Sequence, residues 1–171
     1  IVSDWTGGIY ASVSLPGSRS GSQIVTTWGS LLYHGYVCYK NYSDMIIEKT
    51  NYLKKEIQKI QSFHVIGNPN VNVVAFYSDK FPISQIVDVL QQNDWNLNIL
   101  QNPICLHICI TPKNNKNINK LVALLNDISK QKVSTKTDDN ITAIYGMAEA
   151  IPDKTIINEL VEYYLDLTTD I

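Results

Sequence analysis

The chain has 171 residues, a formal net charge of −2 and a 44% share of hydrophobic residues, which suits one domain, or a domain and part of another, with a buried core. The charge is nearly balanced and no block of basic residues occurs, so the sequence gives no support for nucleic-acid binding. No apolar run approaches the roughly 20 residues that span a membrane.

A glycine-rich stretch, GGIYASVSLPGSRSG, opens the chain from Gly7 to Gly21. It ends directly before a predicted helix, and the first backbone N–H groups of a helix favour an anion. Ser18 adds a hydroxyl donor, Arg19 adds a cation with a fork of donors, and the glycines allow a ligand to approach the backbone closely. The residues alone leave two interpretations open: a phosphate-binding loop, or a tight turn in which Arg19 forms a salt bridge.

Two helices are predicted after this loop. The first covers GSQIVTTWGSLLYHGY, begins at Gly21 and Ser22 and ends at Gly35. Its apolar residues recur at helical spacing: Ile24, Trp28 and Leu31 or Leu32. The second, SDMIIEKTNYLKKEIQKIQ, is capped by Ser43 or Asp44. One of its faces is apolar: Ile46, Leu53, Ile57 and Ile60. Because no strand is predicted in residues 1–62, we expect this part to pack on polypeptide outside the chain.

From Phe63 onward the pattern changes to a small antiparallel sheet with helices over one face. Strands are expected at 63–67, 71–78, 95–100 and 104–110, and helices at 82–94, at 118–128 and after Pro152, with a linker at 130–140. The first of these helices points four residues inward: Ile83, Ile86, Val87 and Leu90. The next aligns Ile118, Leu121, Leu125 and Ile128, and the last presents Ile157, Leu160, Tyr164 and Leu167.

Candidate catalytic and metal-binding residues are few. Cys105, His107 and Cys109 would share one strand face, but their spacing matches no common zinc signature, so a half-buried sheet face is the better interpretation. His34 and His64 have no obvious partners nearby in sequence, so we expect surface or packing roles. No complete active site can be recognised from spacing. Three cysteines without disulfide-framework spacing favour a reducing compartment.

DWTGGIYASVSLPGSRSG, residues 4–21, closely resembles a stretch of the sphingosine-1-phosphate lyases, whose pattern there is approximately D-W-x-G-G-x-Y-x-S-P-T-x-A-G-S-R-P-G. The chain departs from the pattern at Val13, Ser14, Pro16 and Ser20, where the family usually has Pro, Thr, Ala and Pro. Three later segments resemble the same family: TNYLKKEIQKIQSFHVIGNP, NDWNLNILQNPICLHICIT and TAIYGMAEAIPD. The resemblance therefore extends over nearly the whole chain.

The resemblance implies an α/β fold of the fold-type I, pyridoxal-phosphate-dependent transferase-like class. Residues 1–62 would end the large cofactor domain, and residues 63–171 would form the small C-terminal α+β domain. The implied reaction cleaves a phosphorylated long-chain base to a fatty aldehyde and phosphoethanolamine. The family's Schiff-base lysine lies in a His-Lys-Tyr-Gly context, and no His-Lys pair occurs in this sequence. We therefore expect the anchor lysine, and any membrane anchor, upstream of a C-terminal portion.

The resemblance also implies site residues. Ser18 would reach across a homodimer interface to the phosphate of the neighbour's pyridoxal phosphate, within a loop, residues 7–21, that enters the neighbouring active site. Gly17 and Arg19 would shape the same site, and Tyr10 would lie near its mouth. No catalytic residue and no metal ligand is expected in this segment. Two alternatives remain: a non-catalytic α+β interaction module, and an amino-acid decarboxylase of the same fold.

Overall fold

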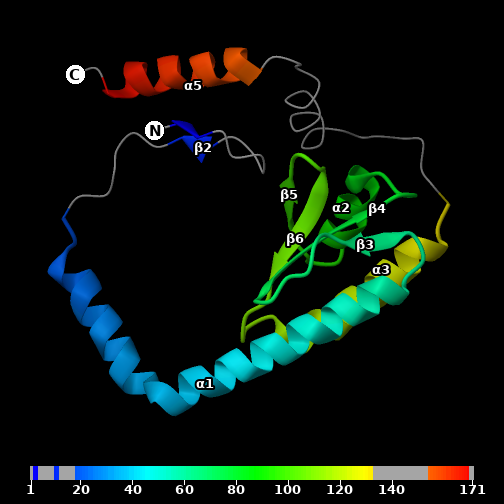
Figure 1. Cartoon of the computed structure of the whole chain (residues 1–171), viewed down its shortest axis with the longest axis horizontal. Helices are drawn as coiled ribbons and strands as arrows, with labels where there is room; N and C mark the ends of the chain where they lie inside the picture. The colour runs from blue at the N-terminus through cyan, green and yellow to red at the C-terminus, as the bar shows by residue number, and fades with distance from the viewer. Residues whose placement is uncertain (1, 4–9, 12–17, 133–153, 170–171) are drawn as a thin grey trace. The chain divides into compact units, whose positions relative to one another are not determined.

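The computed structural model describes residues 2–3, 10–11, 18–132 and 154–169 (Figure 1). They belong to two compact units. One unit comprises Ile1–Ser18, Leu100–Pro103 and Asp138–Ile171, and the other comprises Arg19–Ile99 and Ile104–Thr137. The predicted domain boundary between residues 62 and 63 concerns the whole protein, and it stays a prediction.

The first unit contains two short strands and a helix. Strand β1, Val2–Ser3, pairs antiparallel with β2, Tyr10–Ala11, so that Val2 lies opposite Ala11. The expectation that residues 1–62 contain no strand is therefore wrong, because strands of two residues are too short to show alternation in a sequence. Helix α5 spans Lys154–Thr169 and contacts β1. It begins where the sequence predicts, directly after Asp153.

The second unit contains most of the regular structure. Its elements in chain order are α1, Gly21–Lys59; β3, Phe63–Val65; β4, Val73–Ser78; α2, Ile83–Gln91; β5, Asn98–Leu100; β6, Cys105–Cys109; the 3-10 turn η1, Asn115–Asn117; and α3, Ile118–Lys130. Of the predicted linker, residues 130–140, the part from residue 133 onward lies outside the described residues.

A four-stranded sheet in the order β3-β4-β6-β5 forms the centre of this unit, and β4 is antiparallel to both β3 and β6. Phe76 lies opposite Leu106, and Val74 lies opposite Ile108, so these side chains share one face. All four are buried. The predicted antiparallel sheet is confirmed. The strand expected at 95–100 is paired only from Asn98, although burial still alternates along it.

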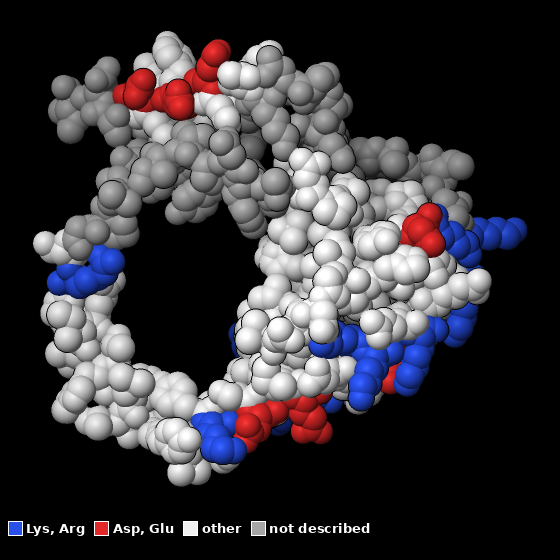
Figure 2. Space-filling model, viewed as in Figure 1, with Lys and Arg blue, Asp and Glu red and all other residues white. Residues whose placement is uncertain are grey.

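Helices cover the buried face of the sheet. The second half of α1 contacts β3, β4 and α3, and α2 contacts α3 (Figure 1). Of the predicted inward residues of these helices, Ile46 is only half-buried. The others are buried: Leu53, Ile57, Ile60, Ile83, Ile86, Val87, Leu90, Ile118, Leu121, Leu125 and Ile128. Charged side chains gather along the second half of α1 (Figure 2), on the side away from this core. The core of the unit was therefore predictable from helical periodicity.

Helix α1 differs from the two separate helices that the sequence predicts. Gly35 has φ 62° and ψ 173°, outside the helical region, and the two helices meet there in a kink without a loop. The predicted cap at Ser43 or Asp44 is wrong. Ser43 Oγ donates to the backbone oxygen of Tyr39 at 2.9 Å, and Asp44 pairs with Lys40 at 2.6 Å, as residues inside a helix do.

Candidate functional site

The predicted anion site lies at the start of α1, and Ser20 organises it. Ser20 is the N-cap: its backbone oxygen accepts from the Gln23 N–H at 3.1 Å, and its Oγ lies 3.4 Å from the same nitrogen. The two hydroxyls of Ser20 and Ser22 are 2.9 Å apart. The predicted helix start at Gly21 is confirmed, but the capping residue was missed. The segment Ser20-Gly21-Ser22-Gln23 fits the capping-box pattern, a signal that could have identified it.

Ser18 and Arg19 directly precede this cap, and both are exposed. Arg19 also lines an open groove of about 660 Å³. The other lining residues come from α1: Gln23, Ile24, Thr26, Thr27, Trp28 and Leu31. At Gly21 an added Cβ would meet no atom within 4 Å, so the space beside the helix start is open. A cation, hydroxyl groups and the helix N-terminus therefore adjoin an open space.

The threonines of the groove contribute less to an anion site. Thr26 Oγ1 donates to the backbone oxygen of Ser22 at 2.8 Å, and Thr27 Oγ1 donates to that of Gln23 at 2.8 Å. A hydroxyl has one proton to donate, so these two offer a ligand mainly acceptor lone pairs. The groups that could donate to an anion here therefore include Ser18, Arg19, the Gln23 side-chain amide and the first N–H groups of the helix. The Ser20 and Ser22 hydroxyls bond to each other, so this pair has one proton left to donate.

Two other predicted site residues are described incompletely. Tyr10 lies in β2, where its backbone pairs with Ser3, and its side chain lies outside the described residues. Gly17 also lies outside them. The assignment of Tyr10, Gly17, Ser18 and Arg19 to a cofactor site therefore stays a prediction.

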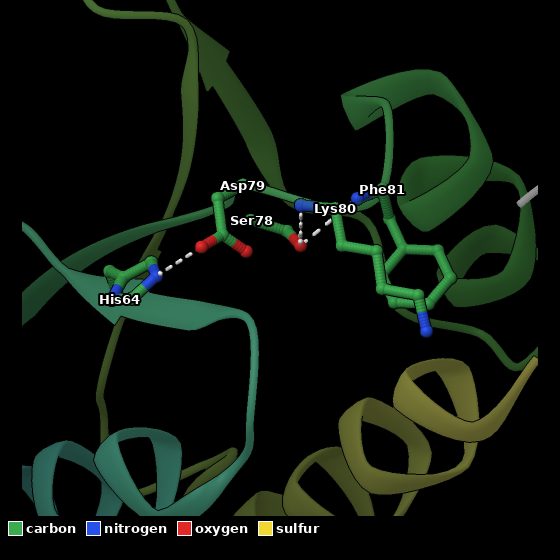
Figure 3. Close-up of polar contacts among 5 residues, drawn as sticks. All are labelled: His64, Ser78, Asp79, Lys80 and Phe81. Carbon is green, nitrogen blue, oxygen red and sulfur yellow. Dashed lines mark hydrogen bonds and ion pairs between the residues drawn. The ribbon is translucent and has the colours of Figure 1, made fainter.

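His64 forms a contact that the sequence did not reveal. Its Nε2 lies 3.1 Å from Asp79 Oδ2, and both side chains are about half exposed (Figure 3). The antiparallel register, with His64 opposite Tyr77, brings the two residues together across fifteen positions of sequence. The neighbouring Ser78 Oγ accepts from the backbone N–H groups of Lys80 and Phe81, at 3.2 and 3.1 Å. That hydroxyl therefore caps the turn before α2, and the cluster is not a Ser-His-Asp triad.

His34 also has a partner, contrary to the expectation from sequence. Its Nδ1 lies 3.7 Å from Cys38 Sγ, one helical turn further along α1 and beside the kink. The hydrogen bond of Tyr42 with the Cys38 side chain raises the pKa of the Tyr42 phenol above its usual value. Spacing of four residues on a helix was the signal that could have identified this pair.

Cys105, His107 and Cys109 alternate along β6 as predicted, and their environments differ. Cys105 is buried, and burial raises the pKa of its thiol. Cys109 is exposed and accepts a hydrogen bond from Asn72 Nδ2 at 2.9 Å. In residues 2–3, 10–11, 18–132 and 154–169, no cluster of three His, Cys, Asp or Glu side chains could hold a metal ion. None of the described helices is long and apolar enough to cross a membrane.

Comparison with known proteins gives a consistent result. No protein-family model matches the chain. The chain is 35% identical over 170 residues to sphingosine-1-phosphate lyase 1 of Rattus norvegicus, and this match covers 95% of the chain and 29% of the rat protein. It is 31% identical over 170 residues to the sphingosine-1-phosphate lyase of Arabidopsis thaliana, covering 96% of the chain and 31% of that protein.

A solved structure agrees with the sequence comparison. The structure of a Burkholderia pseudomallei sphingosine-1-phosphate lyase superposes with a TM-score of 0.62 at 28% identity, over 99% of this chain and 35% of that one. The chain thus spans about 30% of the length of the curated relatives it matches, and it corresponds to their C-terminal part. Its α/β fold is that of the equivalent part of a fold-type I enzyme.

Proposed function

Since the chain is a homologue of the sphingosine-1-phosphate lyases, which are pyridoxal-phosphate-dependent enzymes, we propose that it is the C-terminal part of such a lyase. The reaction is the cleavage of a phosphorylated long-chain base to a fatty aldehyde and phosphoethanolamine. The observation that carries the proposal is the 35% identity to the rat lyase over 95% of the chain. When bound, pyridoxal phosphate supplies the electron sink for breaking the carbon–carbon bond.

The residues at the start of α1 fit the phosphate of this cofactor. A phosphate prefers a helix N-terminus, charge-assisted donors and backbone that it can approach closely. Arg19, the exposed Ser18 hydroxyl and the open space at Gly21 offer these features within four residues. Ser20 caps the helix and so fixes the direction of its first N–H groups. Their role is to bind and orient the cofactor.

The rest of the active site comes from other polypeptide. The anchor lysine belongs to the upstream part of the protein, because none of the lysines here follows a histidine. We propose that the protein is a homodimer, in which the loop of residues 7–21 enters the active site of the neighbouring subunit. Ser18 then serves the neighbour's cofactor, flanked by Gly17 and Arg19, with Tyr10 near the mouth of the site.

The reaction is tested on the longer protein that contains this chain. Incubation with pyridoxal phosphate and a phosphorylated long-chain base should release a long-chain aldehyde. Release of carbon dioxide from amino acids without aldehyde would instead identify a decarboxylase. If a folded protein that contains the anchor lysine has neither activity, the non-catalytic interaction module is the remaining alternative.

The dimer is tested by complementation. A Ser18→Ala variant, assayed at a cofactor concentration too low to support its activity, is mixed with a variant that lacks the anchor lysine. If Ser18 acts on the neighbouring subunit, the mixed dimer holds one intact site, and activity should appear on mixing. If Ser18 acts within its own subunit, no combination contains an intact site, and the mixture should stay inactive.

A further inference from the structure

Charge is distributed unevenly along the chain, although its total is close to zero. Two segments, residues 48–59 of α1 and residues 113–132 with η1 and α3, contain nine lysines and three acidic residues, a net charge of +6. The rest of the chain contains 5 of the 14 basic and 13 of the 16 acidic residues, a net charge of −8. The lysines of the two segments are Lys49, Lys54, Lys55, Lys59, Lys113, Lys116, Lys120, Lys130 and Lys132.

Folding brings the two segments together. Helix α1 contacts α3, and the two helices lie side by side on the sheet (Figure 1). Because their apolar residues point into the core, their polar sides form one outer surface of the second unit. Seven of the nine lysines are exposed, and Figure 2 shows blue atoms gathered over the last turns of α1, at the lower right. We call these nine lysines the lysine surface.

Acidic neighbours leave most of this charge in place. Glu56 pairs with Lys59 at 2.6 Å, and Asp127 pairs with Lys130 at 3.4 Å. The other seven lysines form no ion pair with a described residue. Lys49, for example, lies over the ring of Tyr52, a neutral partner, with its Nζ 4.8 Å from the ring centroid. A surface with this excess of positive charge attracts an anionic partner.

The residue types of the lysine surface fit an anionic bilayer. All of its cations are Lys, whose ammonium is a strongly hydrated point charge without the fixed fork of donors that Arg presents. Protein interfaces are instead depleted in Lys and enriched in Arg. Tyr52 is the only aromatic residue of the two segments, so they offer no series of rings on which nucleic-acid bases could stack. Clusters of lysines are, in contrast, typical of surfaces that bind anionic lipids.

We propose that the lysine surface binds a membrane that contains anionic lipids. The inference rests on the proposed function, because the hydrocarbon chain of a phosphorylated long-chain base favours a bilayer over water. The negative potential of such a membrane attracts each lysine near it. The lysine surface would therefore hold the protein at the place where its substrate resides.

Acetylation of lysines in the longer protein by a water-soluble reagent, read by mass spectrometry, tests the contact directly. With vesicles of phosphatidylcholine and phosphatidylserine, Lys55, Lys116 and Lys132 should react at least about threefold more slowly than without vesicles, because the bilayer limits access to them. Lys40 and Lys80 lie outside the two segments and are the controls, whose rates should not change. At about 0.5 M salt the protection should disappear, because salt screens the attraction.

Substitution of the same lysines gives an independent measurement. The triple variant Lys55→Gln, Lys116→Gln and Lys132→Gln should cosediment with these vesicles with an affinity roughly a hundredfold lower. The matched control, Lys40→Gln, Lys80→Gln and Lys154→Gln, changes the net charge equally outside the lysine surface. Its affinity should fall less than about threefold. If other parts of the longer protein hold every variant on the vesicles, acetylation of the unsubstituted protein still decides.

Three outcomes would overturn the inference. They are equal acetylation with and without vesicles, equal protection by vesicles of pure phosphatidylcholine, and protection by duplex RNA but not by vesicles, which identifies nucleic acid as the partner. An aldehyde assay on the same samples separates this inference from the proposed function. Protected lysines in an inactive protein refute the function alone, and unprotected lysines in an active protein refute the membrane contact alone.

Discussion

The first half of α1, residues 21–39, which contains the kink at Gly35, and its second half, residues 40–59, have opposite chemistry. The second half carries charges at regular intervals: Lys40, Asp44, Glu48, Lys49, Lys54, Lys55, Glu56 and Lys59. It buries one face completely, with Leu53 and Ile57 at 0% exposure. The first half has no charge and no buried face, although it is the more apolar of the two. The difference teaches that the positions of charged residues indicate which faces of a helix are adapted to water. The exposed fraction of the apolar side chains in this chain does not.

The largest expected difference between the halves is in the stability of the second unit. Leu53→Ala should lower the free energy of unfolding of the 171-residue chain by about 2–5 kcal/mol, because it leaves a cavity in a packed core. Leu32→Ala should change it by less than about 0.5 kcal/mol, because Leu32 is exposed in this chain. Denaturant titration followed by circular dichroism measures both values. Equal losses would show that the two halves share one core, and the comparison would fail.

Cofactor binding tests the start of the first half. Ser18→Ala in the longer protein should weaken affinity for pyridoxal phosphate by roughly ten- to a hundredfold, since a charge-assisted hydrogen bond contributes about 1.5–3 kcal/mol. Arg19→Ala should weaken it at least as much, because the substitution also affects the proposed dimer interface. The measurement is the cofactor concentration for half-maximal aldehyde release.

Ser43→Ala in the second half is the matched control for that titration. The Ser43 hydroxyl is exposed and donates only to the backbone oxygen of Tyr39 among the described residues. Its removal should leave the cofactor titration unchanged. If the titration of Ser18→Ala overlays that of the parent protein, the glycine-rich loop is only a turn.

The kink within the first half of α1 depends on Gly35. Its φ of 62° and ψ of 173° lie where residues with a Cβ rarely occur, so Gly35→Ala should destabilise the chain by about 1–3 kcal/mol. Gly29 has helical geometry and open space around its Cα. Gly29→Ala should therefore stabilise the chain by up to about 1 kcal/mol. Thermal unfolding of both variants should thus give shifts of opposite sign. A stabilising Gly35→Ala would mean that the helix prefers to be straight.

Sequence reasoning succeeded where one face of an element is buried against another in this chain. Helical periodicity indicates which face of a helix is buried. It therefore identified core residues directly, namely Leu53 and Ile57 in α1 and Leu121 and Leu125 in α3. It missed contacts that depend on pairing between strands. The His64–Asp79 contact follows from the register of β3 and β4, which single-sequence patterns do not specify.

The candidate site at the start of α1 could be proposed from the sequence for a related reason, and its role stays a prediction. The glycines, Ser18, Arg19 and the helix start are neighbours in sequence, so their joint chemistry could be read locally. The Ser20 cap lies in the same stretch, and its capping-box spacing to Gln23 is a local signal as well. The proposed neighbouring subunit and the anchor lysine lie on other polypeptide, and no pattern within residues 1–171 could supply their geometry.

The smallest expected effect concerns the charges that distinguish the second half. Lys40 and Asp44 form an ion pair of 2.6 Å just after the uncharged half, with side chains 56% and 64% exposed. Exposed pairs four residues apart contribute about 0.3–0.5 kcal/mol, and less when the cation precedes the anion, as here. A double-mutant cycle of Lys40→Gln and Asp44→Asn in the 171-residue chain should give a coupling below about 0.5 kcal/mol, and 1 M salt should abolish it by screening. A coupling above about 1 kcal/mol that survives salt would mean that these charges hold the helix together at its kink. The small value expected here instead implies that they keep the second half facing water, a role whose removal costs little stability.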